Sequence, residues 1–226
     1  MIGDRILVIA PHCDDEVLGC GGVIKKFVEQ GKSVHVAIVT NGNIGAPELF
    51  KAEGTAKVRE EAVHANNFLG VKEVIFLDFP GPRLDSVPSY KIAMAFSKTI
   101  DKHKIDTLFI PHRGDLHKDH RITYEAALVA ARPTADATVN TVLAYETLSE
   151  TEWAAPFGDD AFIPNIFIDI EETLEYKKNA FKIYTTQLRK FPHPRSIKGI
   201  ENLAMYRGAT VGLEAAECFM MVRAKL

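Results

Sequence analysis

Short, largely apolar runs alternate with amphipathic segments along the first 145 residues. The apolar runs show no polar–apolar alternation, as expected of strands buried on both faces of a parallel sheet. We predict five such strands, at residues 5–10, 34–39, 73–77, 107–110 and 141–145. Between them apolar residues recur at helical spacing, for example at Val58, Ala62, Ala65 and Leu69. This alternation predicts a parallel, Rossmann-like sheet with helices on both faces.

The pattern becomes less regular after residue 150. Apolar segments at 167–170 and 219–222 predict two more strands, and 171–187 predicts a helix. A chain of 226 residues is long enough for one substantial core and short for two. We therefore predict an α/β fold, a three-layer sandwich with a mainly parallel Rossmann-like sheet, forming a single domain over 1–226. Residues 1–150 are the Rossmann-like half and 151–226 its less regular completion.

Composition narrows the classes of function. The net charge is −3 and no run is rich in Lys or Arg, so neither nucleic acid nor an anionic membrane is an expected partner. No apolar stretch approaches the roughly 18 residues of a membrane span, and no cleavable leader is evident. Three cysteines, an odd and low count, suit a reducing compartment better than a disulfide framework. We expect a cytoplasmic protein.

The first candidate site follows the first strand. His12, Asp14, Asp15 and Glu16 occupy four of five consecutive positions there. His12 and Asp15 can converge on one cation if the turn folds around it, which leaves Asp14 free. The alternative is that these carboxylates only cap the next helix, whose N-terminus favours negative charge.

The second candidate site follows the fourth strand. Three histidines and two aspartates fall within nine positions: His112, Asp115, His117, Asp119 and His120. The alternative is a polar loop in which His120 lines or caps the next helix. A parallel sheet of order 3-2-1-4-5 makes strands one and four neighbours, however, and ligands bind at the carboxyl ends where the order reverses. Both clusters lie at those ends.

Together the clusters predict a catalytic metal site. His12, Asp15 and a histidine of the second cluster supply three N/O ligands and leave a position for water, as in a catalytic zinc site with one ion per chain. Asp14 can then act as the general base. A protonated His117 could stabilise an oxyanion and protonate the leaving amine. Asp119 could orient His117 or support a metal-bound histidine.

The same motifs carry a family resemblance. Residues 11–16, followed by 18–22, resemble the signature of the PIG-L/LmbE-like zinc de-N-acetylases, and residues 117–120 are similar to that family's second motif. Weaker similarities lie at 59–61, 69–71, 145–146, 206–208 and 217–219. The resemblance implies that the zinc ligands are His12, Asp15 and His120. It also implies that Asp14 is the general base and that His117 stabilises the oxyanion. It further implies that Arg59 binds substrate. Cys13 stands where the family usually has proline, which leaves open whether Cys13 contacts the metal.

The predicted activity is removal of an N-acetyl group from a small amide, such as an N-acetylglucosamine-type sugar or sugar conjugate. Arg59, Arg83 and Arg113, with Asn41 and Asn43, are candidate substrate contacts because their donors suit hydroxyls or anions. One alternative is a related zinc amidase acting on another C–N bond, such as that of a thiol conjugate. The other is a non-catalytic, Rossmann-like nucleotide-binding module. Whether the chain forms a homo-oligomer is open.

Overall fold

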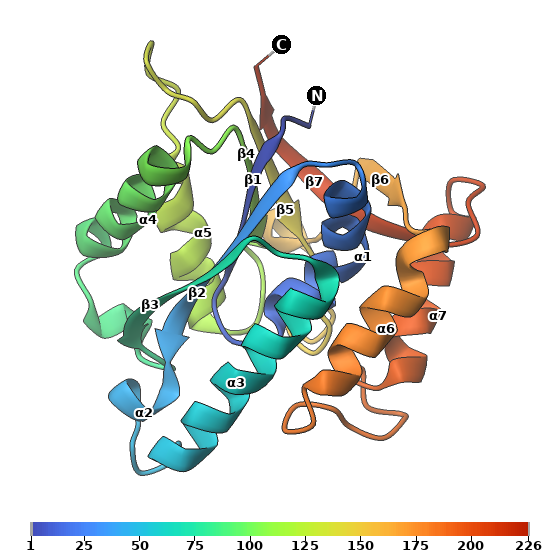
Figure 1. Ribbon diagram of the computed structural model, residues 1–226, viewed down its shortest axis with the longest axis horizontal. Helices are drawn as coiled ribbons and strands as arrows, with labels where there is room; N and C mark the ends of the chain where they lie inside the picture. The colour runs from blue at the N-terminus through green and yellow to red at the C-terminus, as the bar shows by residue number, and fades with distance from the viewer. Residues whose placement is uncertain (1, 226) are drawn as a thin grey trace.

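The computed structural model describes residues 2–225 and shows one sheet of seven strands (Figure 1). The order is β3-β2-β1-β4-β5-β7-β6, in which the first five strands are parallel and β7 runs antiparallel to both β5 and β6. The strands are β1 Arg5–Ala10, β2 Ser33–Asn41, β3 Glu73–Pro80, β4 Thr107–Pro111, β5 Thr141–Tyr145, β6 Ile166–Asp169 and β7 Ala216–Ala224. The predicted fold class and the order of the five parallel strands are confirmed.

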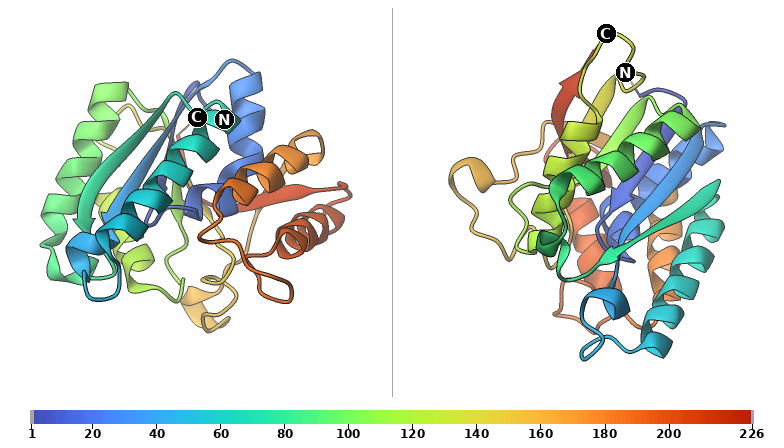
Figure 2. Two further views of the ribbon diagram at one scale, coloured as in Figure 1. Left: turned by 60° about the horizontal axis from the view of Figure 1, so that its bottom comes forward. Right: turned by 90° about the vertical axis from the view of Figure 1, so that its left-hand side faces the viewer.

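Helices cover both faces of the sheet, which makes three layers (Figures 1 and 2). One face carries α1 Asp15–Glu29, α3 Ala52–Leu69, α6 Leu174–Ile183 and α7 Ile197–Ala209. The other carries α4 Ser89–His103 and α5 Lys118–Ala130. Short helical turns are α2 Gly42–Gly45, η1 Leu84–Ser86, η2 Gly158–Asp160 and η3 Glu171–Thr173. No helix among residues 2–225 is both long and apolar enough to cross a membrane.

Alternate residues of β1 supply the two halves of the core. Ile6 and Val8 pack beneath α1 and α3, whereas Leu7 and Ile9 pack beneath α4 and α5. Because both faces are buried, the strand needs apolar residues at successive positions rather than at every second one. This is why a continuous apolar run predicted β1 correctly.

The helix α7 was not predicted from the sequence. Its buried positions, Ile200, Ala204 and Gly208, have helical spacing, but two of them are small and the apolar Met205 between them is exposed, which weakens the amphipathic pattern. The Ser196 side chain accepts a hydrogen bond from the backbone N–H of Gly199, which caps the start of the helix. Packing of α7 against α6 and β7 thus stabilises a helix that the local sequence pattern specifies only weakly.

Glycines let α1 lie close to the sheet. A Cβ atom at Gly19 would come 2.3 Å from the ring of Tyr145, and one at Gly22 would come 2.8 Å from Ile170. The Tyr145 ring is buried and its hydroxyl donates to the carbonyl of Ile9 at 2.8 Å, so it has little freedom to move. The glycine-rich stretch in α1 therefore serves close packing of the helix against the sheet.

Replacement of Gly19 by alanine should therefore destabilise the fold. We expect Gly19→Ala to lower the free energy of unfolding by about 1–3 kcal/mol, the usual cost of overpacking a core. The matched control is Gly54→Ala in α3, where an added Cβ meets no atom within 4 Å. That control should be neutral or stabilising, because alanine loses less backbone freedom on folding. Urea unfolding measures both, and equal effects would contradict the packing role.

Candidate functional site

Three side chains converge at the carboxyl ends of β1 and β4. His12 lies in the loop after β1, Asp15 begins α1, and His120 lies in the first turn of α5. His12 Nδ1 lies 3.4 Å from Asp15 Oδ2 and 3.3 Å from His120 Nε2. His120 Nε2 lies 3.2 Å from the same carboxylate oxygen. The three predicted ligand atoms therefore point toward one small space.

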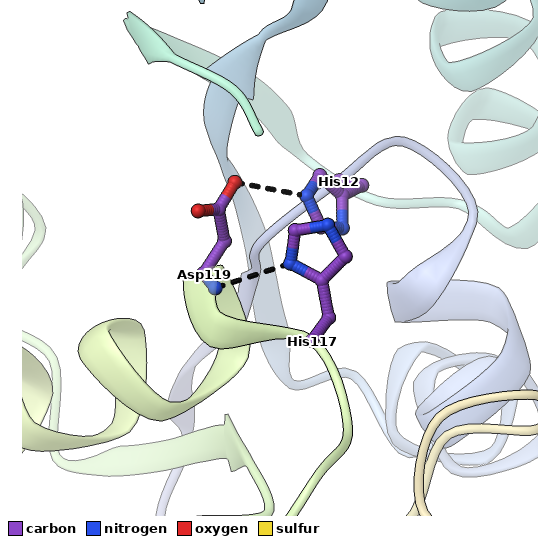
Figure 3. A group of neighbouring side chains, drawn as sticks. All are labelled: His12, His117 and Asp119. Atoms are coloured by element: carbon purple, nitrogen blue, oxygen red, sulfur yellow. Dashed lines mark hydrogen bonds and ion pairs between the residues drawn. The ribbon is translucent and has the colours of Figure 1, made fainter. Parts of the chain in front are cut away.

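The outer nitrogen of each imidazole faces a second carboxylate. His120 Nδ1 lies 2.8 Å from Asp115 Oδ2, and His12 Nε2 lies 3.2 Å from Asp119 Oδ2 (Figure 3). A proton on each outer nitrogen donates to its carboxylate and leaves the inner lone pair free to bind a cation. Asp119 thus supports His12 with its carboxylate. Of its two predicted roles, this contact favours support of a metal-bound histidine over orientation of His117.

The electrostatics of this centre favour a positive charge. Five carboxylates around it are almost fully buried: those of Asp14, Asp15, Glu16, Asp115 and Asp119. Burial alone would lower the pKa of His12, but hydrogen bonds to Asp119 and Asp15 raise it to about 9. Asp15 and Asp115 likewise hold the pKa of His120 well above its usual range against the effect of burial. Two imidazoles, a carboxylate and a surplus of negative charge fit a divalent metal ion such as zinc.

Asp14 is held beside this centre in a strained conformation. Its φ of 105° is one that residues other than glycine rarely adopt. The backbone N–H of Asp14 donates to Glu16 Oε2 at 3.1 Å, and Glu16 Oε1 accepts from the Asn66 amide at 2.9 Å and from the Tyr184 hydroxyl. Glu16, whose role the sequence left undecided, therefore anchors the turn that presents Asp14.

The Asp14 carboxylate also has a partner from a distant segment. Arg195 Nη1 lies 3.4 Å from Asp14 Oδ2, and both residues line the cavity. Burial and the neighbouring Asp15 raise the pKa of Asp14 well above its usual range, while Arg195 opposes that change. A raised pKa makes a carboxylate a stronger base, which suits Asp14 to the role of a proton acceptor.

His117 is the N-cap residue of α5 and faces the same cavity. Its Nδ1 accepts a hydrogen bond from the backbone N–H of Asp119 at 3.1 Å (Figure 3). Burial and the neighbouring His12 lower the pKa of His117 to about 4. A lowered pKa favours the neutral ring near pH 7, whereas donating a proton to the leaving amine requires the charged ring, so the protonation of His117 during turnover stays a prediction. Because Nδ1 is an acceptor, the proton of the neutral ring lies on Nε2, which can donate a hydrogen bond.

The site opens into a cavity of about 580 Å³. Arg59, Asn41 and the segment beyond residue 150 contribute to its wall, the last through Thr186, Gln187 and Arg195. The Arg59 guanidinium pairs with Asp78 and lies 3.9 Å from the centre of the Phe76 ring. Leu49 and Phe50 form an apolar part of the wall.

The other two predicted arginine contacts have partners elsewhere. Arg113 Nε donates to the carbonyl of Asp159 at 2.8 Å, and Arg83 approaches the carbonyl of Gly45 at 3.5 Å. Neither arginine is among the residues that line the cavity. Their part in substrate binding stays a prediction. Cys13 lines the cavity as a free thiol, and burial raises its pKa well above the usual range, which disfavours the thiolate form that binds metals.

Sequence reasoning did not assign roles to Arg195, Asp115 or Glu150. Asp115 lay inside the second cluster, five positions before His120, and only the loop geometry shows that it faces that ring. Glu150 Oε2 accepts from the backbone N–H of His117 at 3.1 Å. Arg195 is separated from Asp14 by 181 positions, so local spacing carries no signal of their contact.

The chain is similar to proteins of a known family. Residues 7–131 match PIG-L, described as GlcNAc-PI de-N-acetylase. An uncharacterised deacetylase of Escherichia coli K12 is 29% identical over 171 residues, 74% of this chain and 82% of that protein. The diacetylchitobiose deacetylase of Thermococcus kodakarensis is 26% identical over 222 residues, 94% of this chain and 81% of its own length.

Among solved structures, the 4-carboxy-2-hydroxymuconate hydratase of Pseudomonas putida KT2440 superposes with a TM-score of 0.79. The two sequences are 20% identical, and the superposition covers 98% of each chain. A hydratase with this architecture shows that the fold does not dictate one reaction. The family match covers more than half of the chain and includes both His/Asp clusters, and the chain belongs to the PIG-L family.

Proposed function

We propose that this protein is a zinc-dependent hydrolase that removes the acetyl group from an N-acetylglucosamine-type sugar or sugar conjugate. The observation that carries the proposal is the convergence of His12, Asp15 and His120 beside Asp14 and His117, at the wall of a substrate-sized cavity. Family membership and two relatives named as deacetylases support it. Because the fold also hosts a hydratase, the argument rests on the site.

The metal ligands would be His12, Asp15 and His120. Zinc held by them would supply a Lewis acid for the acetamide carbonyl and for the attacking water. Asp119 and Asp115 hold the two imidazoles in the tautomer that binds a cation. The arrangement of donors and second carboxylates thus suits a catalytic site with an open position.

The remaining residues account for the proton transfers of amide hydrolysis. Asp14, with its raised pKa, would take a proton from the attacking water. The Nε2–H of neutral His117 would donate a hydrogen bond to the oxyanion of the tetrahedral intermediate. Asp14 would then return its proton to the leaving nitrogen, because a neutral His117 with a lowered pKa is a poor proton donor. Acetate and a free amine result.

The cavity supports a substrate larger than an acetamide. Its volume of about 580 Å³ lies in the usual range for small-molecule sites. Arg59 and Asn41 offer donors for hydroxyl or anionic groups, and Leu49 and Phe50 offer an apolar surface for the face of a sugar ring. A different amide, such as a thiol conjugate, is the alternative that substrate screening tests.

The nucleotide-binding alternative is not supported. The glycines of α1 pack against Tyr145 and Ile170 and leave no room for a phosphate group. The relatives named above are deacetylases. A cytoplasmic location and the oligomeric state stay predictions.

Zinc binding should release protons. The raised pKa values of His12 and His120 mean that, at pH 7 and without metal, each ring carries a proton on both nitrogens. The metal must displace the proton on the inner nitrogen of each ring. The apparent zinc affinity should therefore fall as the pH falls below about 9, the pKa of His12. Calorimetric titration in two buffers of different ionisation enthalpy measures the protons released. Absence of proton release at pH 7 would contradict the charge argument.

The two adjacent aspartates should give different defects. Asp14→Asn should keep the metal and slow turnover by roughly 10²–10⁴-fold, the usual contribution of a positioned general base. Asp15→Asn should instead weaken metal retention, because it removes a ligand. Metal content and single-turnover rates of the two variants, measured side by side, separate the roles. If Asp14→Asn lost the metal and Asp15→Asn kept it, the two assignments would be reversed.

Arg59 should act on substrate binding and not on the metal. We expect Arg59→Ala to raise KM by about tenfold or more, the loss of one charge-assisted hydrogen bond, with unchanged zinc content. The control is Lys57→Ala, an exposed position of the same helix outside the cavity wall. The substrate panel should compare acetylated sugars with N-acetyl amino acids. Faster cleavage of the amino acids would refute the sugar assignment and leave the amidohydrolase assignment intact.

A further inference from the structure

A second histidine cluster lies at the opposite edge of the sheet from the cavity. His35 lies near the start of β2, Glu73 begins β3, and the two are partners in the parallel register. His103 is the last residue of α4. The rings of His35 and His103 are 4.2 Å apart between centroids, and His103 Nε2 lies 3.5 Å from Glu73 Oε2. One potential ligand atom of each residue lies within 4.8 Å of the other two.

Two imidazole nitrogens of this cluster are buried without a hydrogen-bond partner among residues 2–225. They are His35 Nδ1 and His103 Nε2. His35 is only 3% exposed, and its other nitrogen already contacts the Ser33 hydroxyl at 3.1 Å. Buried polar atoms almost always have partners, but among residues 2–225 His35 Nδ1 has none and His103 Nε2 has only the 3.5 Å contact with Glu73 Oε2. A bound cation would satisfy both.

The charges around this cluster allow it to bind a cation that prefers imidazole ligands. The C-terminal end of α4 carries the negative end of its helix dipole, and Glu73 adds a carboxylate. Lys102 lies 3.3 Å from Glu73 Oε1, which leaves Oε2 on the His103 side, and Lys72 is the other nearby cation.

We propose that His35, Glu73 and His103 form a second divalent transition-metal site, suited to zinc, that links β2 and β3 to the end of α4. Two imidazole nitrogens and one carboxylate oxygen are ligands that zinc accepts, and water can complete the coordination. The site lies at the amino ends of the strands, whereas His12, Asp15 and His120 lie at the carboxyl ends. Its role is therefore to stabilise the fold, and it does not depend on the proposed deacetylase activity.

Zinc stoichiometry tests the proposal directly. After removal of metal with a chelator, the wild-type protein should bind two zinc ions per chain in a calorimetric titration. His120→Ala should bind one, at the second site, and His120→Ala/His103→Ala should bind none. Adding Glu73→Gln to His120→Ala should weaken the remaining site. His64→Ala in the same background is the matched control, an exposed histidine on α3, and should still bind one.

Thermal unfolding provides a second measurement. It uses substitutions of His103, which lies at the end of α4, where a change should still allow the protein to fold. With free zinc at 100 times its Kd, the Tm of His120→Ala should rise by about 5–10 °C, from a binding stabilisation of about 2.7 kcal/mol. The rise should disappear in His120→Ala/His103→Ala. The single variant His103→Ala should keep the wild-type rate of turnover.

The outcomes separate this proposal from the proposed function. If His120→Ala binds no zinc, or if His103→Ala in that background changes neither stoichiometry nor Tm shift, the second site does not exist. If the wild-type protein binds a single ion that His103→Ala removes and His120→Ala retains, the second site stands. The zinc centre at His12 would then be refuted.

Discussion

The concentration of carboxylates at the carboxyl ends of β1 and β4 is the constraint on which the site depends. Five almost fully buried acidic side chains cannot all stay ionised without positive partners, because removing a charge from water is costly. His12 and His120 supply part of the compensation, and their raised pKa values show how strongly the centre attracts a cation. A bound divalent ion would complete it.

The sheet and its helices fix the positions of these charged side chains. β1 is central, with β2 and β4 as parallel neighbours, so the loops after β1 and β4 meet at the point where the strand order reverses. The Glu16 network then fixes the turn at Asp14, and the backbone of Asp119 fixes His117. The strain at Asp14 is stored where a reacting group must be presented, a common feature of functional sites.

The two edges of the sheet differ in what surrounds their histidines. At the carboxyl edge the rings of His12 and His120 each have a carboxylate behind them, and His12 also lines the cavity. At the amino edge His35 and His103 have buried nitrogens without partners and a single carboxylate beside them. Catalytic sites need both the supporting carboxylates and the open space. The amino edge has the ligands for a metal without the cleft for a substrate.

The sequence by itself determined the strands, their parallel order and the pairing of the two His/Asp clusters. Continuous apolar runs mark buried strands, and the order of elements along the chain leaves few topologies for a parallel sheet. It also brought together the two clusters that contain the candidate ligands and Asp14, because residues that follow neighbouring strands must meet at one edge. The choice of His120 within the second cluster came from the family resemblance. The local pattern could not find α7, a helix of weak amphipathic character that gains its order from packing.

Only the tertiary structure decided what each polar group faces. Arg195 reaches Asp14 across 181 positions, and Asp115 rather than Asp119 supports His120. The protonation of His117 depends on burial and on the charges of its neighbours, which spacing along the chain does not encode. Local patterns specify which face of an element is buried. Electrostatic environments arise from long-range contacts, and these exist only once the chain has folded.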